Sequence, residues 1–245
     1  MKIEAKGCHY KTLNEKVHQA IAEGAREIFL DQVNGQRYLG DAIQKEEVQI
    51  TIRGTPGNDL AAFMDGPTVT VHGNAQDGVG NTMNGGKIII HGDAGDIAGY
   101  AMRGGKIYIQ GNAGYRVGIH MKAFNELFPV IIIGGRAGNF LGEYMAGGLI
   151  IVLGLGAEED HSPVGTYVGT GMHAGKIYIR GRVRNYQLGK EIRIFDIDEE
   201  DREEMDSFLA EYCRDFSFPW EEIRKGPFVK LIPFTHRPYG KLYAY

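Results

Sequence analysis

Short β-branched segments recur along the chain, and each ends in a glycine. The first and third positions of these segments are always Val or Ile, whereas the fourth is mostly polar. Alternation with a period of two places successive side chains on opposite faces of a strand, so the first and third positions are predicted to point to the interior. Seven segments follow this template, at residues 50–54, 69–73, 88–92, 107–111, 131–135, 150–154 and 177–181.

The closing glycines are spaced by 19, 19, 19, 24, 19 and 27 residues. A period near 20 residues with one strand in each period is typical of a solenoid, and it is too short for a strand plus a crossover helix. The pattern therefore predicts an all-β protein, a single-stranded parallel β-helix of about seven to eight coils. The longer spacings place two insertions, at about residues 122–129 and 155–164.

A series of methionines keeps step with the closing glycines, and a glycine stands three residues before five of them. The glycines are predicted to turn a corner where a Cβ would crowd the next coil or where φ is positive. The methionines are interpreted as interior or corner fillers rather than as a ligand-binding stripe. These structural repeat positions are Gly80, Gly99, Gly118, Gly142, Gly169, Met83, Met102, Met121, Met145 and Met172.

The N-terminal part departs from the repeat. Residues 12–23 are predicted to form a helix, because residues 12–15 read as a capping box and Leu13, Val17 and Ile21 recur at four-residue spacing. Residues 34–43 resemble a degenerate first coil. We therefore predict an N-terminal cap and degenerate first coil over residues 1–45, followed by the β-helix over residues 46–195.

Residues 196–245 are predicted to form a C-terminal helix and an extended arm. Asp198 is expected to cap a helix that runs to about Cys213. Its apolar face consists of Met205, Phe208, Leu209 and Tyr212. The stretch from Phe216 onward is rich in aromatic residues and proline, and it is expected to pack on the solenoid or on a partner.

Composition narrows the possible functions. The chain has 245 residues and a formal net charge of −4, so nothing in its charge favours nucleic acid binding. Two widely separated cysteines, Cys8 and Cys213, lack the paired spacing of a zinc or cluster site. No segment approaches 18 consecutive apolar residues, so we expect a soluble, cytoplasmic protein without a membrane partner.

Candidate catalytic and metal-binding groups are weak. His72 and His91 occupy the same template position in adjacent coils, but the next coil offers Gln110, a poor metal ligand, and a solvated stack is the simpler interpretation. Glycine patterns such as residues 92–95 recur in every coil without a following helix, so they do not indicate a phosphate loop. We therefore predict no catalytic residue, cofactor or metal on this chain.

The first insertion is the sequence's best candidate for a partner interface. Phe124, Leu127 and Phe128 bring three large apolar side chains out of a corner between strands. Exposed apolar protrusions of this kind often mark docking surfaces. The alternative is that these side chains fold back onto the wall of the solenoid. A homo-oligomer is a further possibility.

Residues 92–111, Gly-Asp-Ala-Gly-Asp-Ile-Ala-Gly-Tyr-Ala-Met-Arg-Gly-Gly-Lys-Ile-Tyr-Ile-Gln-Gly, and their neighbours resemble the GXGXG domain at the C-terminus of the glutamate synthase large subunit. A similar repeat occurs in one of the subunits of formylmethanofuran dehydrogenase. The resemblance covers roughly residues 30–195 and implies a right-handed parallel β-helix with an architectural role. In glutamate synthase, other domains supply the N-terminal Cys nucleophile, FMN and an iron-sulfur cluster, and this chain lacks all of them.

Three functional hypotheses follow. The first is a non-catalytic scaffold subunit of a split glutamate synthase-like complex, whose partner chains carry FMN and the iron-sulfur cluster. The second is a scaffold in a molybdenum or tungsten formylmethanofuran dehydrogenase complex. The third is a free-standing β-helix enzyme that acts on carbohydrate, which would need a cleft lined with acidic or basic residues.

Overall fold

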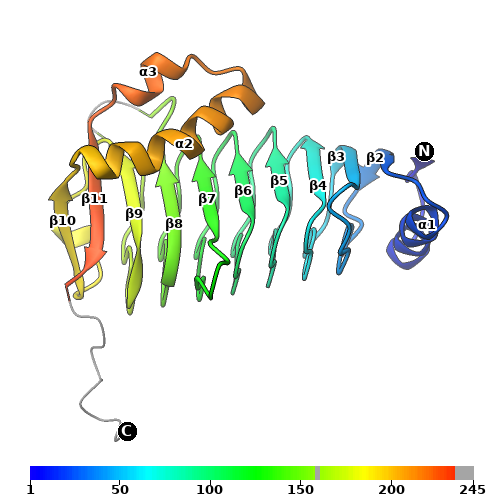
Figure 1. The fold of residues 1–245 in the computed structure, drawn as a ribbon, viewed down its shortest axis with the longest axis horizontal. Helices are drawn as coiled ribbons and strands as arrows, with labels where there is room; N and C mark the ends of the chain where they lie inside the picture. Colours follow the sequence, from blue (N-terminus) through cyan, green and yellow to red (C-terminus); the bar gives the residue numbers. More distant parts are fainter. Residues whose placement is uncertain (158–160, 235–245) are drawn as a thin grey trace, which may run out of the picture.

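The computed structural model describes residues 1–157 and 161–234 and shows a chain wound into a solenoid, whose strands lie side by side in one sheet (Figure 1). Within the described residues, the sheet has 11 strands in the order β1 to β9, then β11 and β10. The parallel strands stacked along the solenoid are β1 Lys2–Glu4, β2 Glu27–Asn34, β3 Gln49–Thr55, β4 Thr68–His72, β5 Lys87–Ile90, β6 Lys106–Ile109, β7 Val130–Ile133, β8 Ala146–Val152 and β9 Ala174–Arg180. The other elements are α1 Tyr10–Ala22, η1 Asn185–Gln187, β10 Ile192–Asp196, α2 Glu199–Phe216, α3 Trp220–Arg224 and β11 Phe228–Pro233.

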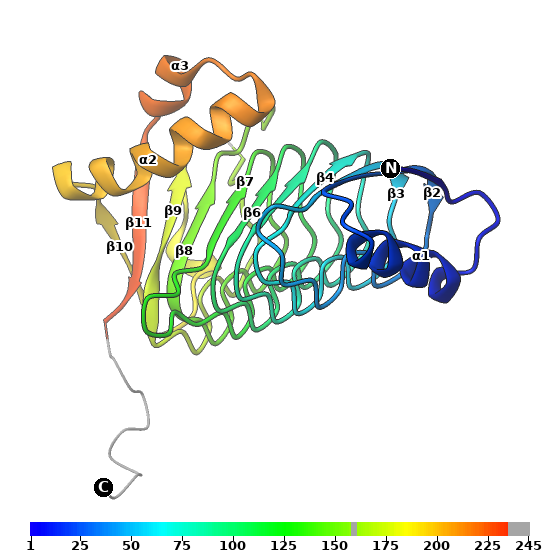
Figure 2. The same ribbon diagram turned by 45° about the vertical axis from the view of Figure 1, so that its right-hand side comes forward.

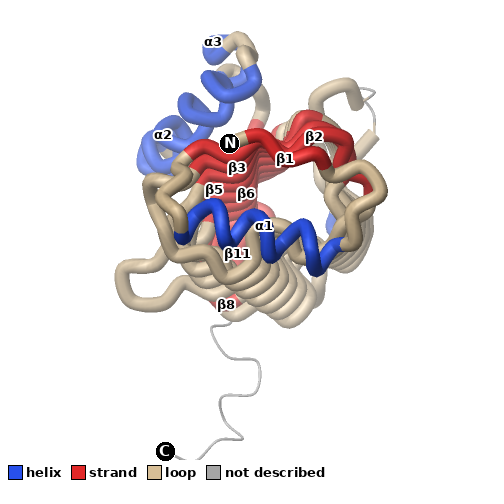
Figure 3. The backbone as a smooth tube through the Cα atoms, turned by 90° about the vertical axis from the view of Figure 1, so that its right-hand side faces the viewer, coloured by secondary structure: helices blue, strands red, loops and turns tan. Residues whose placement is uncertain are grey.

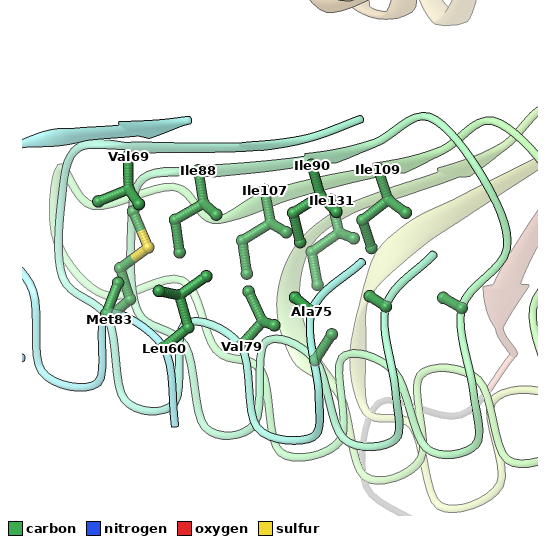
Figure 4. Close-up of a cluster of buried hydrophobic side chains, with 14 of the residues drawn as sticks. Leu60, Val69, Ala75, Val79, Met83, Ile88, Ile90, Ile107, Ile109 and Ile131 are labelled. Carbon is green, nitrogen blue, oxygen red and sulfur yellow. The ribbon is translucent and has the colours of Figure 1, made fainter. Parts of the chain in front are cut away.

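The template positions of the sequence become the register of the sheet. Ile88 pairs with Ile107, which in turn pairs with Ile131, and parallel pairing continues without a break from β1 to β9. All fourteen side chains at the first and third template positions are 1 % exposed or less. Figure 4 shows one row of these side chains, Val69, Ile88, Ile107 and Ile131, facing Leu60 and Val79 across the interior. The predicted parallel β-solenoid is confirmed.

Each coil turns a corner through three residues with positive φ at alternate positions. In one coil these are Arg116 (φ 58°), Gly118 (φ 72°) and His120 (φ 55°). In this coil the middle position lacks room for a side chain, since a Cβ on Gly118 would lie 2.6 Å from Ile150 Cδ1. The equivalent Cβ would meet an isoleucine at 2.4 to 2.7 Å on each of Gly80, Gly99, Gly142 and Gly169. Both reasons offered for these glycines therefore apply.

Helix α1 lies across the N-terminal end of the solenoid (Figure 3). Leu13 and Val17 are fully buried in the main core. The predicted capping box is wrong, because the N-cap is His9 and no side chain caps the helix. Asn14 instead donates to the carbonyls of Tyr10 and Arg37, so it ties the helix to the first coil. Packing over the open end, rather than a local cap, sets where the helix begins.

The predicted degenerate first coil stacks on the coil that follows it. Leu39 and Ile43 are buried, and the Ala61 amide donates to the Leu39 carbonyl at 2.8 Å. Gly40, with φ 77°, occupies the middle corner position of this coil. The solenoid therefore begins before the first segment that obeys the strand template.

Helix α2 lies across the outer face of the solenoid sheet at its C-terminal half (Figures 1 and 2). Asp198 caps it as predicted, by accepting from the Asp201 amide, but the helix continues to Phe216, three residues beyond the predicted end. Under it, Tyr108, Ile132 and Tyr178 at second template positions are fully buried in a second core. The alternation of apolar and polar residues in the strands does not predict that α2 covers this face, because the pattern separates the two faces of the sheet without showing which element packs on either.

The C-terminal arm returns to the solenoid as a strand. β11 lies between β9 and β10 and is antiparallel to both, so the sheet ends in antiparallel pairing rather than in a further coil. Residues 235–245, the rest of the predicted arm, lie outside the described residues. Within the part of the chain that is described, no helix is long and apolar enough to cross a membrane.

Candidate functional site

Exposed aromatic side chains gather on the corners of the later coils, on the residues that flank the middle glycine. We call this surface the aromatic ladder, and it consists of Tyr100, Tyr115, Arg116, His120, Phe140, Glu143, Tyr144 and Tyr167. Four of its tyrosines, Tyr100, Tyr115, Tyr144 and Tyr167, are 37 to 55 % exposed.

One column of the ladder stands two residues before the middle glycine. The guanidinium of Arg116 lies 4.4 Å from the ring centre of Phe140. Phe140 in turn stacks on Tyr167, with centroids 4.8 Å apart and an interplanar angle of 11°. This distance matches the spacing between neighbouring strands, so the coil repeat itself sets the stacking.

The second column stands at or next to the position two residues after the middle glycine. His120 stacks on Tyr144 at 5.2 Å and 11°, and Tyr100 meets His120 edge-on at 6.1 Å. Glu143 joins the two columns, because its buried carboxylate forms an ion pair with Arg116. The guanidinium is thus held from one side by a charge and from the other by a ring.

The backbone presents these side chains at a cost. Arg116, His120, Phe140, Tyr144 and Tyr167 all have φ between 52° and 63°. Left-handed conformations cost non-glycine residues roughly 1 to 2 kcal/mol each. Backbone hydrogen bonds between neighbouring coils offset this cost, as in the bond from the Phe140 amide to the Thr166 carbonyl at 2.8 Å. The corner is consequently a rigid platform, and its tyrosine-rich and arginine-containing composition is that of protein interface hot spots.

A cluster of ionisable groups also lies between α2 and the sheet. Glu211 of α2 accepts from Lys87 at 2.7 Å, from Lys106 at 2.6 Å and from the Tyr108 hydroxyl at 3.0 Å. Burial alone would raise the pKa of Glu211, but the hydrogen bonds and charges of the two lysines outweigh it and lower the pKa to about 2. Burial raises the pKa of Tyr108, and the charge of Glu211 raises it further.

A second such cluster anchors the start of α2. The Tyr178 hydroxyl lies 2.6 Å from Asp201 Oδ1 and 2.8 Å from Glu204 Oε2, so its one proton can be donated to either carboxylate. Lys230 of β11 donates to Asp201 Oδ2 at 2.5 Å. Burial would raise the pKa of Asp201, but the bonds from Lys230 and Tyr178 lower it to about 2. Each carboxylate has its cations in contact, so we interpret both clusters as anchors of α2.

Acidification is therefore expected to release α2 from the sheet. The pKa values of unfolded Asp and Glu are near 4, whereas those of Asp201 and Glu211 are about 2 in the folded protein. Their stabilisation is fully present above about pH 5 and is lost as the pH falls through about 2, by at most about 2 kcal/mol for each group after solvent screening. The fluorescence of Trp220, the single tryptophan, measures the release, because this residue packs against the second core.

Glu211→Gln tests the assignment of this pH dependence. The variant should lose part of the transition below pH 5, since glutamine does not titrate. Glu203→Gln is the matched control, because Glu203 is exposed on the same helix. A pH curve that is the same in wild type and Glu211→Gln would contradict the role given to Glu211.

The predicted repeat residues all lie inside the solenoid. Met83, Met102, Met121, Met145 and Met172 are fully buried, and the glycines three residues before them are buried as well. They belong to the wall and core of the coils, and the aromatic ladder projects from the positions between and beside them.

The first insertion forms a small hairpin, in which Phe124 and Leu127 exchange backbone hydrogen bonds. Phe124, Leu127 and Phe128 are 55, 38 and 43 % exposed. Phe128 stacks on Phe208 of α2 at 6.3 Å, so one of the three side chains folds back while Phe124 projects. Their role as a partner interface stays a prediction. Of the second insertion, residues 158–160 lie outside the described residues.

His72 and His91 stack on the outer wall, with ring centres 4.7 Å apart. The solvated stack is a correct description of exposed His72, but it is wrong for His91, which meets Phe216 of α2 edge-on at 5.1 Å. Burial lowers the pKa of His91, and the neighbouring His72 lowers it further. Across residues 1–157 and 161–234, no three His, Cys, Asp or Glu side chains gather in a way that could hold a metal ion.

The sequence did not predict the aromatic ladder, because the candidate interface was placed at an insertion that interrupts the repeat. The ladder lies within the period. Aligning the coils on their middle glycines would have found it, since Arg116, Phe140 and Tyr167 then share one position, and His120 and Tyr144 share another. What an alignment does not supply is the positive φ that turns both positions outward.

Comparison with known proteins finds one family model and one similar protein, each of which covers most of the chain. A model of the GXGXG motif family matches residues 16–223, which is most of the chain. Uncharacterized protein MJ1350 of Methanocaldococcus jannaschii is 49 % identical over 249 aligned positions, covering 99 % of this chain and 95 % of that protein. On the match over most of its length, the chain belongs to the GXGXG motif family.

Proposed function

We propose that this protein is a non-catalytic scaffold subunit, similar to domain 3 of glutamate synthase, in a multi-chain enzyme complex. The partner chains would be a glutaminase and a synthase that carries FMN and an iron-sulfur cluster, and together they would form glutamate from glutamine and 2-oxoglutarate. Family membership supports the architectural role. The aromatic ladder is the observation that carries the proposal, because it is a rigid surface without a partner among the described residues.

The composition of the aromatic ladder supports docking of a protein rather than chemistry. Tyr144 and Tyr167 offer large, amphipathic rings on a fixed backbone, so little conformational entropy is lost on binding. Arg116 and Glu143 neutralise each other, and no other carboxylate belongs to the ladder as a partner for general acid-base catalysis. We therefore place the contact with the synthase chain on this face.

The test is affinity purification of the tagged protein from its native source, with the co-purifying chains identified by mass spectrometry. Glutaminase and FMN-synthase chains are expected in fixed stoichiometry. Tyr144→Asn combined with Tyr167→Asn should weaken their binding by roughly 10- to 100-fold, since central aromatic side chains carry much of an interface's energy. Asparagine is chosen because it tolerates positive φ, so the rings are removed without new backbone strain.

Phe29→Asn is the matched control, because Phe29 is 46 % exposed on β2, at the other end of the solenoid. It should leave partner binding unchanged. Recovery of the protein alone at every salt concentration would contradict the proposal. Recovery with molybdopterin-containing formyl-dehydrogenase chains would replace it with the second hypothesis.

A further inference from the structure

A pocket of about 840 Å³ opens beside the C-terminal end of β9. Arg180, Arg182 and Arg184 line it together. The chain bends at Gly181, with φ 122°, directly after β9, and the three arginines on either side of this bend face one space. This pocket lies at the end of the repeat and is separate from the aromatic ladder.

The packing around Arg180 is specific. Its backbone is held by pairing with Phe228 of β11. A Cβ on Gly226 would lie 2.1 Å from Arg180 Nε and 2.6 Å from its Cδ, so a side chain at residue 226 would displace the arginine. Arg180 Nε is buried without a hydrogen-bond partner, and Nη1 reaches the Leu153 carbonyl only at 3.5 Å. A buried N–H donor without an acceptor costs free energy, so an acceptor that reaches this half-buried side chain would be favoured.

The charges of the pocket are not balanced by the neighbours that the structure describes. Among residues 1–157 and 161–234, none of the three arginines forms an ion pair with a carboxylate, whereas Lys87, Lys106, Lys176 and Lys230 are all paired with acids of α2. Among the described residues that line the pocket there are three arginines and no carboxylate, on a chain whose net charge is −4. Clefts of one sign attract ligands of the other.

We propose that this pocket binds the phosphate group of a small molecule. Guanidinium groups recognise phosphate oxygens with paired hydrogen bonds, and three of them match a dianion. The volume exceeds what phosphate alone would fill. Pro163, Val183 and Val229 also line the pocket and offer an apolar wall to an organic part of the ligand.

Isothermal titration calorimetry at constant ionic strength tests this with two probes, inorganic phosphate and glycerol phosphate. Saturable binding of at least one is expected, and tighter binding of the ester would indicate a phosphorylated small molecule rather than free phosphate. Arg182→Gln combined with Arg184→Gln should weaken binding by about 10-fold or more. Both residues are exposed, so their replacement leaves the fold intact.

Arg53→Gln is the matched control, because Arg53 stands in β3 at the template position that Arg180 occupies in β9, and it is exposed. It should leave binding unchanged. Arg180→Gln should abolish the rise in melting temperature that phosphate causes in the wild type. Absence of saturable binding of both probes, or equal weakening by Arg53→Gln and the double variant, would overturn the proposal. Neither outcome bears on the scaffold role, which the partner purification tests.

Discussion

Gly118→Ala is expected to destabilise the protein by roughly 2 to 5 kcal/mol. The residue has φ 72°, and its new Cβ would lie 2.6 Å from Ile150 Cδ1. A left-handed alanine and an overpacked interior both contribute to the loss. The measurement is urea-induced unfolding followed by circular dichroism, compared with His120→Ala. His120 already carries a side chain at φ 55°, so this control should change the free energy of unfolding by only about 0.5 kcal/mol.

The loss of stability due to overpacking can be separated from the loss due to the backbone conformation with a second substitution. Ile150→Val removes the Cδ1 atom that the new methyl group would meet. Gly118→Ala combined with Ile150→Val should therefore be more stable than the sum of the two single losses predicts. Strict additivity would show that overpacking is not the cause. Ala61, with φ 56°, occupies the same corner position in an earlier coil, so a Cβ is not excluded from every coil.

Asp201→Ala is expected to destabilise the protein by about 3 to 5 kcal/mol, because removal of one partner of a buried ion pair leaves the other uncompensated. The side chains of Asp201 and Lys230 are only 2 and 15 % exposed. The variant also loses one of the two acceptors of the Tyr178 hydroxyl and the carboxylate that accepts from the Asp198 amide at the helix start. Thermal unfolding should show a lower melting temperature, with early release of α2 reported by Trp220.

The control for this variant is Asp206→Ala on the same helix. Asp206 pairs with Arg224 at 2.7 Å, but both side chains are more exposed, at 22 and 43 %. Pairs of this kind contribute about 0 to 1 kcal/mol. Equal losses in the two variants would contradict the distinction between an anchor of α2 and a surface pair.

The fold was predictable because a solenoid repeats one physical rule. Val or Ile at the first and third positions of seven segments specified the inner face, and the constant spacing specified the coil. The ends were less predictable. Helix α1 begins two residues before the predicted start because it covers an open end, and β11 enters between β9 and β10 from far along the chain. Pairing over such distances leaves no periodic signal.

The candidate sites were harder to predict than the fold. Phe124, Leu127 and Phe128 stood out because they interrupt the period, whereas the aromatic ladder keeps it. The three arginines of the pocket are visible in the sequence, but ordinary exposed arginines look the same. Only Gly226 and the buried Arg180 Nε distinguish the pocket, and Gly226 lies 46 positions further along the chain.

The amino-acid sequence by itself determined the parallel solenoid, its buried aliphatic rows and its glycine corners, because each depends on residues a fixed distance apart. The tertiary structure decided what covers the outside: α2 on the second core, the aromatic ladder left open, and β11 closing the sheet beside the arginine pocket. The physical reason is that a repeat fixes which face each side chain occupies, while the partner of that face comes from a segment whose position no local pattern encodes.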